Sequence, residues 1–150
     1  EELSKITTNE NLPQITIPPE KLQASLKQHD LNSSLSSEPF QLFCNGHYNE
    51  AVRKALEKYE NKVRDVSSIE ASGRELMGKA FSSARYIIID EIEPENRQDF
   101  IDGYRFLAMG SMAAIRNIFS HGDEDQRTPE ESYEMLLFIN WLFRFITELE

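Results

Sequence analysis

The residues best suited to chemistry lie in one short run, RNIFSHG, which contains Arg116, Asn117 and His121. Histidine titrates near neutral pH and can pass a proton to or from a reacting oxygen. The guanidinium of an arginine is a planar fork of donors that suits a phosphate group and stabilises additional negative charge on it. An asparagine amide can orient a phosphate oxygen or the histidine ring. Together, these residue types are compatible with a reaction at a phosphate.

The spacing within this run raises a geometric question, because four residues separate Arg116 from His121. In a regular helix, five steps of about 100° turn the chain by roughly 140°, so the two side chains would diverge. They converge only if the helix loosens near Ser120, which Gly122 favours, or if a second copy of the chain brings its own motif to the same cleft. The alternative interpretation is a surface arginine and a histidine favoured by the dipole at a helix C-terminus.

Two strong helical patterns flank the run. The first predicts a long helix over about 96–120, with Gly122 placed to end it. The second begins at Thr128 as N-cap, with Pro129 at the first helical position and Glu131 completing a capping box. Its body, MLLFINWLFRFI, is apolar on nearly every side, which is typical of a helix that is buried all round. In so small a domain it must be central or be covered by a second copy.

The remaining patterns are mostly helical as well. A short helix is expected over 40–46, closed by its last glycine, and a longer amphipathic helix from 47 to 66. The run SGRELMGKAF predicts a shorter helix with a weaker pattern. Residues 86–94 are β-branched and apolar up to a proline, so they fit either a short strand or an extended connector.

These patterns divide the chain into two parts. Residues 1–38 are polar and rich in proline and serine, and we interpret them as an arm or linker that can contain one short helix. Residues 39–150 are expected to form an all-α bundle of four to five helices, with at most one short strand pair. A chain of 150 residues is long enough for one such domain and too short for two.

Charge limits the functions that the sequence can support. The formal net charge of -10, from 26 acidic and 16 basic residues, argues against broad affinity for nucleic acid, because phosphate binding requires Lys and Arg to displace counterions. Any contact with RNA must therefore come from a local site. The acidic run 123–125, which follows His121 after one glycine, counts against such a contact.

The cysteine and histidine content gives no sign of a metal or another cofactor. Cys44 is the only cysteine, so there is no intramolecular disulfide, and a reducing cytoplasmic setting fits best. The three histidines, His29, His47 and His121, are too scattered for a metal-ligand spacing. No stretch approaches the roughly 18 apolar residues of a membrane span, so no membrane association is expected.

The sequence resembles the HEPN superfamily, whose members carry an arginine, usually a polar residue after it, and a histidine four to six residues further on. RNIFSH fits this Rx4H pattern with Arg116, Asn117 and His121. Within the superfamily the resemblance is closest to the Ymh-type family of bacterial proteins. The matching features are a GHY segment before a helix, here Gly46 to Tyr48, an IRN run that ends in SHG, and an aromatic-rich final helix. The resemblance covers roughly residues 40–148.

The resemblance implies a metal-independent endoribonuclease of a prokaryotic phage-defence or toxin system, with the three motif residues as its catalytic set. It also implies a homodimer whose two motifs face each other, and a cleavage in which the ribose 2′-hydroxyl attacks to leave a 2′,3′-cyclic phosphate. The alternative is a non-catalytic HEPN-type module that oligomerises or binds a partner protein or fused domain, and the acidic balance favours this alternative. A third possibility is a phosphate or nucleotide sensor that uses Arg116 without cleavage.

Overall fold

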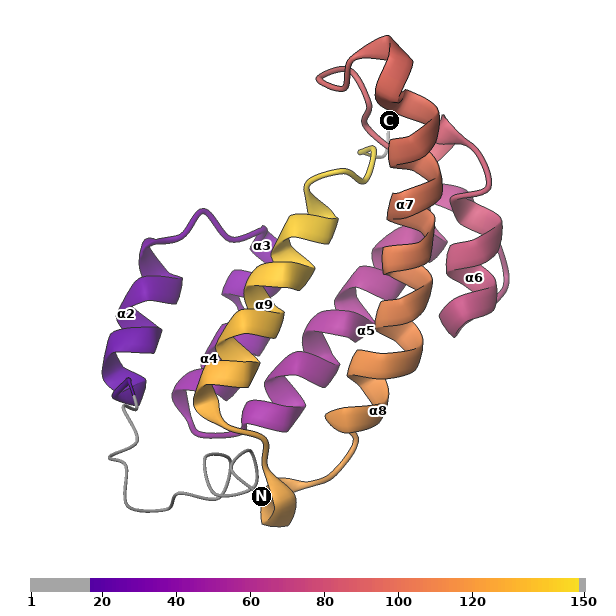
Figure 1. The fold of residues 1–150 in the computed structure, drawn as a ribbon. Coiled ribbons are helices and arrows are strands. Elements are labelled where there is room, and N and C mark those ends of the chain that lie inside the picture. The colour runs from indigo at the N-terminus through magenta and orange to yellow at the C-terminus, as the bar shows by residue number, and fades with distance from the viewer. Residues whose placement is uncertain (1–16, 149–150) are drawn as a thin grey trace, which may run out of the picture.

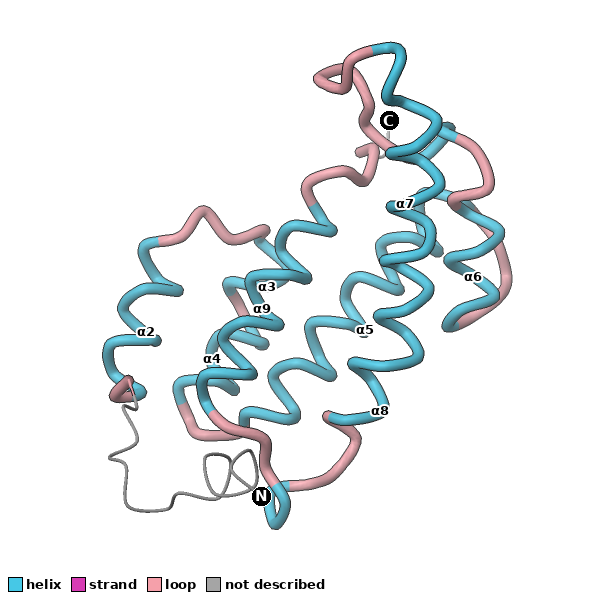
Figure 2. The backbone as a smooth tube through the Cα atoms, viewed as in Figure 1, coloured by secondary structure: helices cyan, strands magenta, loops and turns pink. Residues whose placement is uncertain are grey.

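The structure is a computed structural model that describes residues 17–148. Within this range the chain is a bundle of helices, and the only β-pairing is one isolated bridge (Figures 1 and 2). The prediction of an all-α bundle is confirmed. The α-helices are α2 (Pro19–Gln28), α3 (Ser33–Ser36), α4 (Glu38–Cys44), α5 (Tyr48–Ser67), α6 (Gly73–Ala80), α7 (Arg97–Gly110), α8 (Arg116–Ile118) and α9 (Pro129–Phe143).

The amphipathic helix expected over 47–66 is α5, which packs against α4, α6 and α9. Val52, Leu56 and Tyr59 of its apolar stripe are fully buried. Gly46 lies between α4 and α5 with φ of +83°, the left-handed conformation that glycine adopts without strain. The predicted closure of α4 by this glycine is therefore confirmed.

Helix α9 lies across the bundle between α2 and α7, with α5 behind it (Figure 1). The predicted start is observed, since the Thr128 hydroxyl accepts a hydrogen bond from the Glu131 N–H at 3.1 Å. Leu136 and Ile139 are buried, whereas Phe138 and Trp141 are only partly buried. One chain therefore covers one side of this apolar helix and leaves the other side partly open.

Aromatic side chains fill the space between α7 and α9. Phe100 lies 4.9 Å from Phe145 between ring centroids, and Tyr104 lies 6.2 Å from Trp141. Tyr104 also donates a hydrogen bond to the carbonyl oxygen of Leu142 at 2.6 Å, and its hydroxyl is 2.6 Å from that of Tyr59 on α5. Burial raises the pKa of Tyr104 well above its usual range and also raises that of Tyr59. Both hydroxyls therefore stay neutral and link three helices inside the core.

Tyr104→Phe should lower the free energy of unfolding by about 1–3 kcal/mol, because it removes this link and leaves buried polar groups without partners. Urea unfolding followed by circular dichroism measures the change. Tyr86→Phe is the matched control, since the Tyr86 hydroxyl is partly buried and lies 3.5 Å from the Ser67 carbonyl oxygen. A loss at Tyr104 no larger than the loss at Tyr86 would show that the buried link adds no stability.

The described part of the polar N-terminal segment, residues 17–38, contains α2 and α3, one helix more than expected. Leu22, Leu26 and Leu35 are buried in the common core. The turn after α2 is tied to α9, because the Asn140 Oδ1 accepts a hydrogen bond from the Asn32 N–H at 2.8 Å. These residues therefore pack on the bundle. The division of the chain at residue 38 stays a prediction, and residues 1–16 lie outside the described range.

The long helix expected over 96–120 is interrupted. It comprises α7, a π-helical segment at Ser111–Ile115 and α8, and it ends at Ile118. The prediction that Gly122 ends the helix is wrong, because the φ of Gly122 is -78°. At its end the Asn117 carbonyl oxygen accepts from the Ser120 N–H at 3.2 Å, so the chain makes a tight turn there and not another α-helical turn. The Ser120 hydroxyl also donates to the Asn117 carbonyl at 2.7 Å.

The segment over 86–94 was expected to be a short strand or an extended connector, and the structure shows a connector. It follows a 3-10 turn at Ala84–Tyr86 and makes one antiparallel bridge, between Ile87 and Ile146. The Ile88 N–H donates to the Phe145 carbonyl at 2.7 Å. These contacts tie the connector to the end of α9 without forming a sheet.

Candidate functional site

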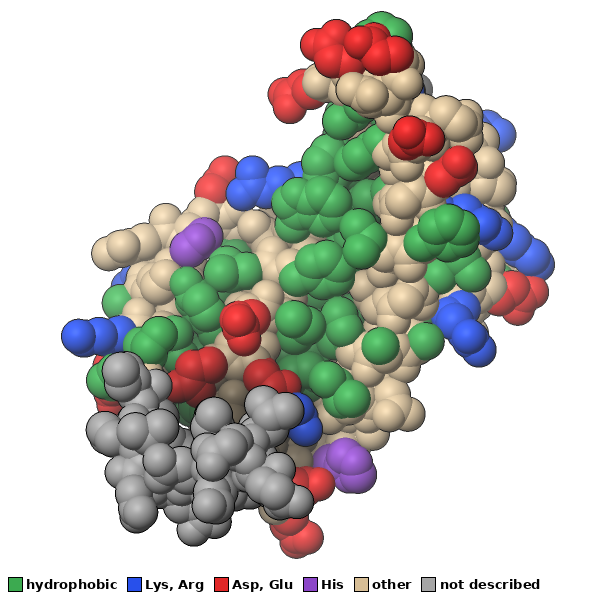
Figure 3. Space-filling view, viewed as in Figure 1, with side chains coloured by type: hydrophobic (Ala, Val, Ile, Leu, Met, Phe, Trp, Pro, Cys, Tyr) green, Lys and Arg blue, Asp and Glu red, His purple; other side chains and the backbone are tan. Residues whose placement is uncertain are grey.

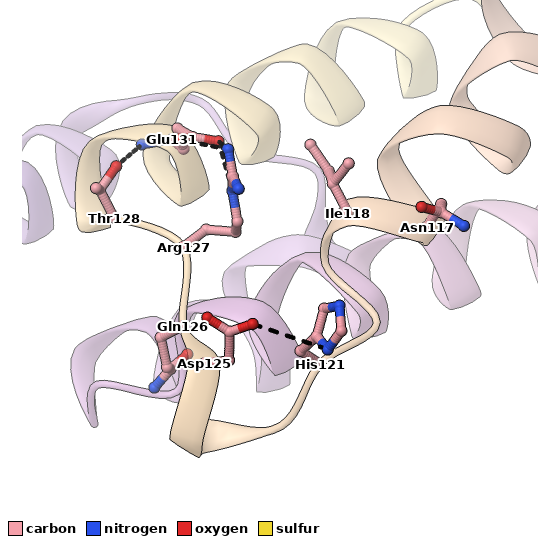
Figure 4. A pocket seen from close by; sticks show the side chains of 8 residues that line it. All are labelled: Asn117, Ile118, His121, Asp125, Gln126, Arg127, Thr128 and Glu131. Carbon is pink, nitrogen blue, oxygen red and sulfur yellow. Dashed lines mark hydrogen bonds and ion pairs between the residues drawn. The ribbon is translucent and has the colours of Figure 1, made fainter.

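A solvent-open pocket lies where α8 ends and α9 begins (Figure 4). Its volume is about 360 Å³. Two of the three predicted site residues, Asn117 and His121, line it, and Arg116 is not among the lining residues. The lining consists of Asn117, Ile118, His121, Asp125, Gln126, Arg127, Thr128 and Glu131.

The side chain of His121 is 63% exposed and lies in the turn that follows α8. Its Nδ1 is 3.9 Å from the Asp125 Oδ2, a pair shown by the dashed line in Figure 4. An exposed pair at this distance contributes little energy. The imidazole is therefore accessible to a ligand in the pocket.

Arg116 is directed toward α5 instead. Its Nη2 donates to the Oε1 of Glu60 at 3.1 Å, and its side chain remains 40% exposed. Glu60 is largely buried, and its Oε2 also accepts from the Gly73 N–H at 2.6 Å. The structure therefore does not bring Arg116 and His121 into one pocket of a single chain. The divergence of roughly 140° expected for a regular helix does not apply, since the helix ends before His121.

Two further α5 side chains hold the backbone of the His121 turn. The Asn49 Nδ2 donates to the carbonyl oxygens of His121 at 2.8 Å and Asp125 at 3.0 Å. The Arg53 Nη1 lies 3.2, 3.0 and 2.9 Å from the carbonyl oxygens of Phe119, Ser120 and His121. These carbonyls have no helical partner, so donors from another helix are needed to satisfy them.

The GHY segment meets the same turn. His47 Nδ1 lies 2.9 Å from the Asp123 Oδ2, and the Gly46 carbonyl oxygen accepts a hydrogen bond from the Gln126 Nε2. The Tyr48 carbonyl oxygen accepts from the Ser132 hydroxyl at 3.0 Å. Two of the three sequence features that carried the family resemblance, the GHY segment and the run that ends in SHG, therefore lie together in space.

The other side of the pocket carries both positively and negatively charged side chains. Arg127 forms a double hydrogen bond with Glu131, with both distances 3.0 Å. This pair occupies the Glu131 carboxylate, which a complete capping box would have directed to the N-cap backbone. Because Asp125 and Glu131 are both acidic, the pocket has no excess of positive charge.

The sequence interpretation missed Asn49, Arg53 and Glu60. A signal for two of them was present, since Asn49 and Glu60 fall at the three- and four-residue spacing of the α5 apolar stripe and are buried there. A polar side chain at such a position must be hydrogen-bonded within the protein. The sequence does not show which segment supplies its partner.

Within residues 17–148 no group of three or more His, Cys, Asp or Glu side chains is arranged to hold a metal ion. None of the helices in that range is both long and apolar enough to cross a membrane.

The fold and the site thus define a class of protein. It is an all-helical domain with a pocket between two helix ends, and His121 is among the residues that line this pocket. A family model described as "Protein of unknown function (Hypoth_ymh)" matches residues 29–146. The chain belongs to this family. Neither the curated proteins nor the solved structures contain a match.

Proposed function

We propose that this protein is a metal-independent endoribonuclease that acts as a homodimer in a prokaryotic phage-defence or toxin system, in the cytoplasm. The observation that carries the proposal is the position of His121, which is exposed in an open pocket beside Asn117 while its backbone is held from α5. A titratable ring on a fixed backbone suits proton transfer. The HEPN-type resemblance of RNIFSH supplies the substrate and the biological setting.

The reaction would use the substrate's own nucleophile. His121 would take the proton of the ribose 2′-hydroxyl or give one to the leaving 5′-oxygen, as the 2′-oxygen forms a bond to phosphorus and the 5′-oxygen bond breaks. Arg116 would stabilise the charge that develops on the phosphate. Since Arg116 does not line the pocket of its own chain, a second copy would have to supply an arginine to it, or Arg116 would have to leave Glu60.

The test is incubation of end-labelled RNA with the purified protein in EDTA. We expect the cleavage activity to coelute with the protein on a size-exclusion column. The 5′ fragments should end in a 2′,3′-cyclic phosphate. The same oligonucleotide with 2′-deoxyribose should resist cleavage. Loss of cleavage in EDTA, or cleavage of the deoxy substrate, would contradict the proposal.

A non-catalytic, partner-binding module is the second candidate. One observation favours it: Arg116 is bound to Glu60 and does not line the pocket that contains His121. The net charge of -10 points the same way. If the purified protein does not cleave end-labelled RNA in this assay, the result would favour this candidate.

The proposed dimer would use the α7–α8 face and the open side of α9. Phe106 is 65% exposed, Leu107 and Ile118 are also exposed, and Trp141 on α9 is only partly buried. Figure 3 shows hydrophobic side chains gathered between α9 and α7. Exposed apolar surface of this kind is typical of protein interfaces.

Phe106→Glu should convert the dimer to a monomer, because it places a charge on the exposed apolar surface proposed for the interface. Sedimentation velocity at micromolar concentration measures the state. Ile17→Glu is the control, since Ile17 is an exposed apolar residue just before α2, which lies on the other side of α9 from α7 (Figure 1), and this variant should remain dimeric. A wild-type monomer at the same concentration would refute the dimer.

A further inference from the structure

We propose that Asn49, assisted by Arg53, is the positioning residue of the site and fixes the backbone from which His121 projects. The inference deepens the proposed ribonuclease function and rests on it. Asn49 lies in the first turn of α5, two residues after the GHY histidine. It makes no contact with the imidazole itself in the structure, so its effect would pass through the backbone.

Both polar atoms of the Asn49 side chain are hydrogen-bonded, and the residue is fully buried. The Nδ2 donates to the His121 and Asp125 carbonyls at 2.8 and 3.0 Å, and the Oδ1 accepts from the Arg127 N–H at 3.0 Å. Its own N–H donates to the Gln126 Oε1 at 2.9 Å. The Asn49 side chain therefore bonds to the backbone at both ends of the segment 121–127.

The segment has little structure of its own to replace these bonds. Between α8 and α9 it contains one 3-10 turn, Asp123–Asp125, closed by a bond from the Asp125 N–H to the Gly122 carbonyl at 3.2 Å. The His121 carbonyl oxygen accepts from both the Asn49 Nδ2 and the Arg53 Nη1. Its backbone is therefore held twice from α5, while the imidazole is left exposed.

This arrangement suits catalysis, because a reacting group must be held within a fraction of an ångström of its productive position. A displacement of about 1 Å can lower a rate by about 100-fold. A histidine on an unsupported turn would lose that position.

The decisive variants are Asn49→Ala and Asn49→Asp. Asn49→Asp keeps an acceptor for the Arg127 N–H but directs a carboxylate oxygen at two carbonyl oxygens, which repels them. We expect kcat for RNA cleavage to fall about 10- to 100-fold in both variants, with a change in KM of less than about threefold. Arg53→Ala, a substitution at a half-buried helix position that should fold, is expected to lower kcat less.

Ser132→Ala is the matched control. It removes a buried hydrogen bond from α9 to the Tyr48 carbonyl, next to Asn49, but none to the His121 turn. Its kcat should equal that of the wild type. If Asn49→Ala and Ser132→Ala have equal kcat at equal melting temperature, Asn49 has only a structural role and the proposal is overturned.

A second readout separates this inference from the proposed function. In NMR spectra of the histidine rings, Asn49→Ala and Arg53→Ala should shift the His121 signals and leave those of His29 unchanged. If wild-type protein fails to cleave RNA but His121 shifts in this way, the ribonuclease proposal fails and the positioning role stands. Unchanged His121 signals in both variants would overturn the positioning role, whatever the activity.

Discussion

His121→Ala should lower the rate of RNA cleavage by about 10²- to 10⁴-fold, the range expected when a general acid or base is removed. The imidazole is exposed in the pocket and makes one long ion pair, to Asp125. Its removal should therefore leave the fold and melting temperature nearly unchanged. Cleavage of labelled RNA in EDTA measures the rate, and thermal unfolding followed by circular dichroism measures the melting temperature.

The control is His29→Ala, since His29 is exposed at the C-terminal end of α2, away from the pocket. Its rate should equal that of the wild type. If His121→Ala cleaves as fast as His29→Ala, His121 is not catalytic. Arg116→Ala should also abolish cleavage, and Asn117→Ala should have a smaller effect, because an amide can orient groups but carries neither the proton nor the charge.

Phe119→Ala should lower the free energy of unfolding by about 3–5 kcal/mol, as expected when a buried phenylalanine is replaced and leaves a cavity. Phe119 lies inside the RNIFSH motif, and its side chain is fully buried. It therefore anchors the end of α8 to the core. Urea unfolding, with the slope m unchanged, measures the loss.

Ile118→Ala is the comparison at the neighbouring position, where the side chain is 42% exposed. It should cost less than about 1 kcal/mol. Similar losses at both positions would mean that Phe119 does not anchor the motif. If the loss at Phe119 is the larger one, as expected, the motif combines one residue that stabilises the fold with polar residues that form the site.

The helices could be predicted from the sequence because their apolar spacing and end signals are local. The Thr128 cap, the left-handed Gly46 and the apolar stripe of α5 each depend on residues within a few positions of one another. The interruption after α7 was not predicted. The small residues of that region fit an α-helix equally well, and the π segment does not follow from their spacing.

The site was only partly predictable. Residue types identified His121 and Asn117, which line the pocket. The partner of Arg116 was not predictable, since Glu60 is 56 positions away in the sequence. The position of the His121 turn likewise depends on Asn49, which is 72 positions from it. Such long-range pairs become visible only once α5 and α8 are packed together.

The π segment Ser111–Ile115 makes the motif tolerant of the loss of one codon in this stretch of the chain. A π turn accommodates one residue more than an α turn, so loss of a single codon here would restore a regular α-helix. The residues after it, Arg116 included, would keep about the same direction around the helix axis, because one turn would still separate them from α7. Arg116 would therefore still face Glu60. Deletions of one codon in this segment should be less harmful than substitutions in the motif itself.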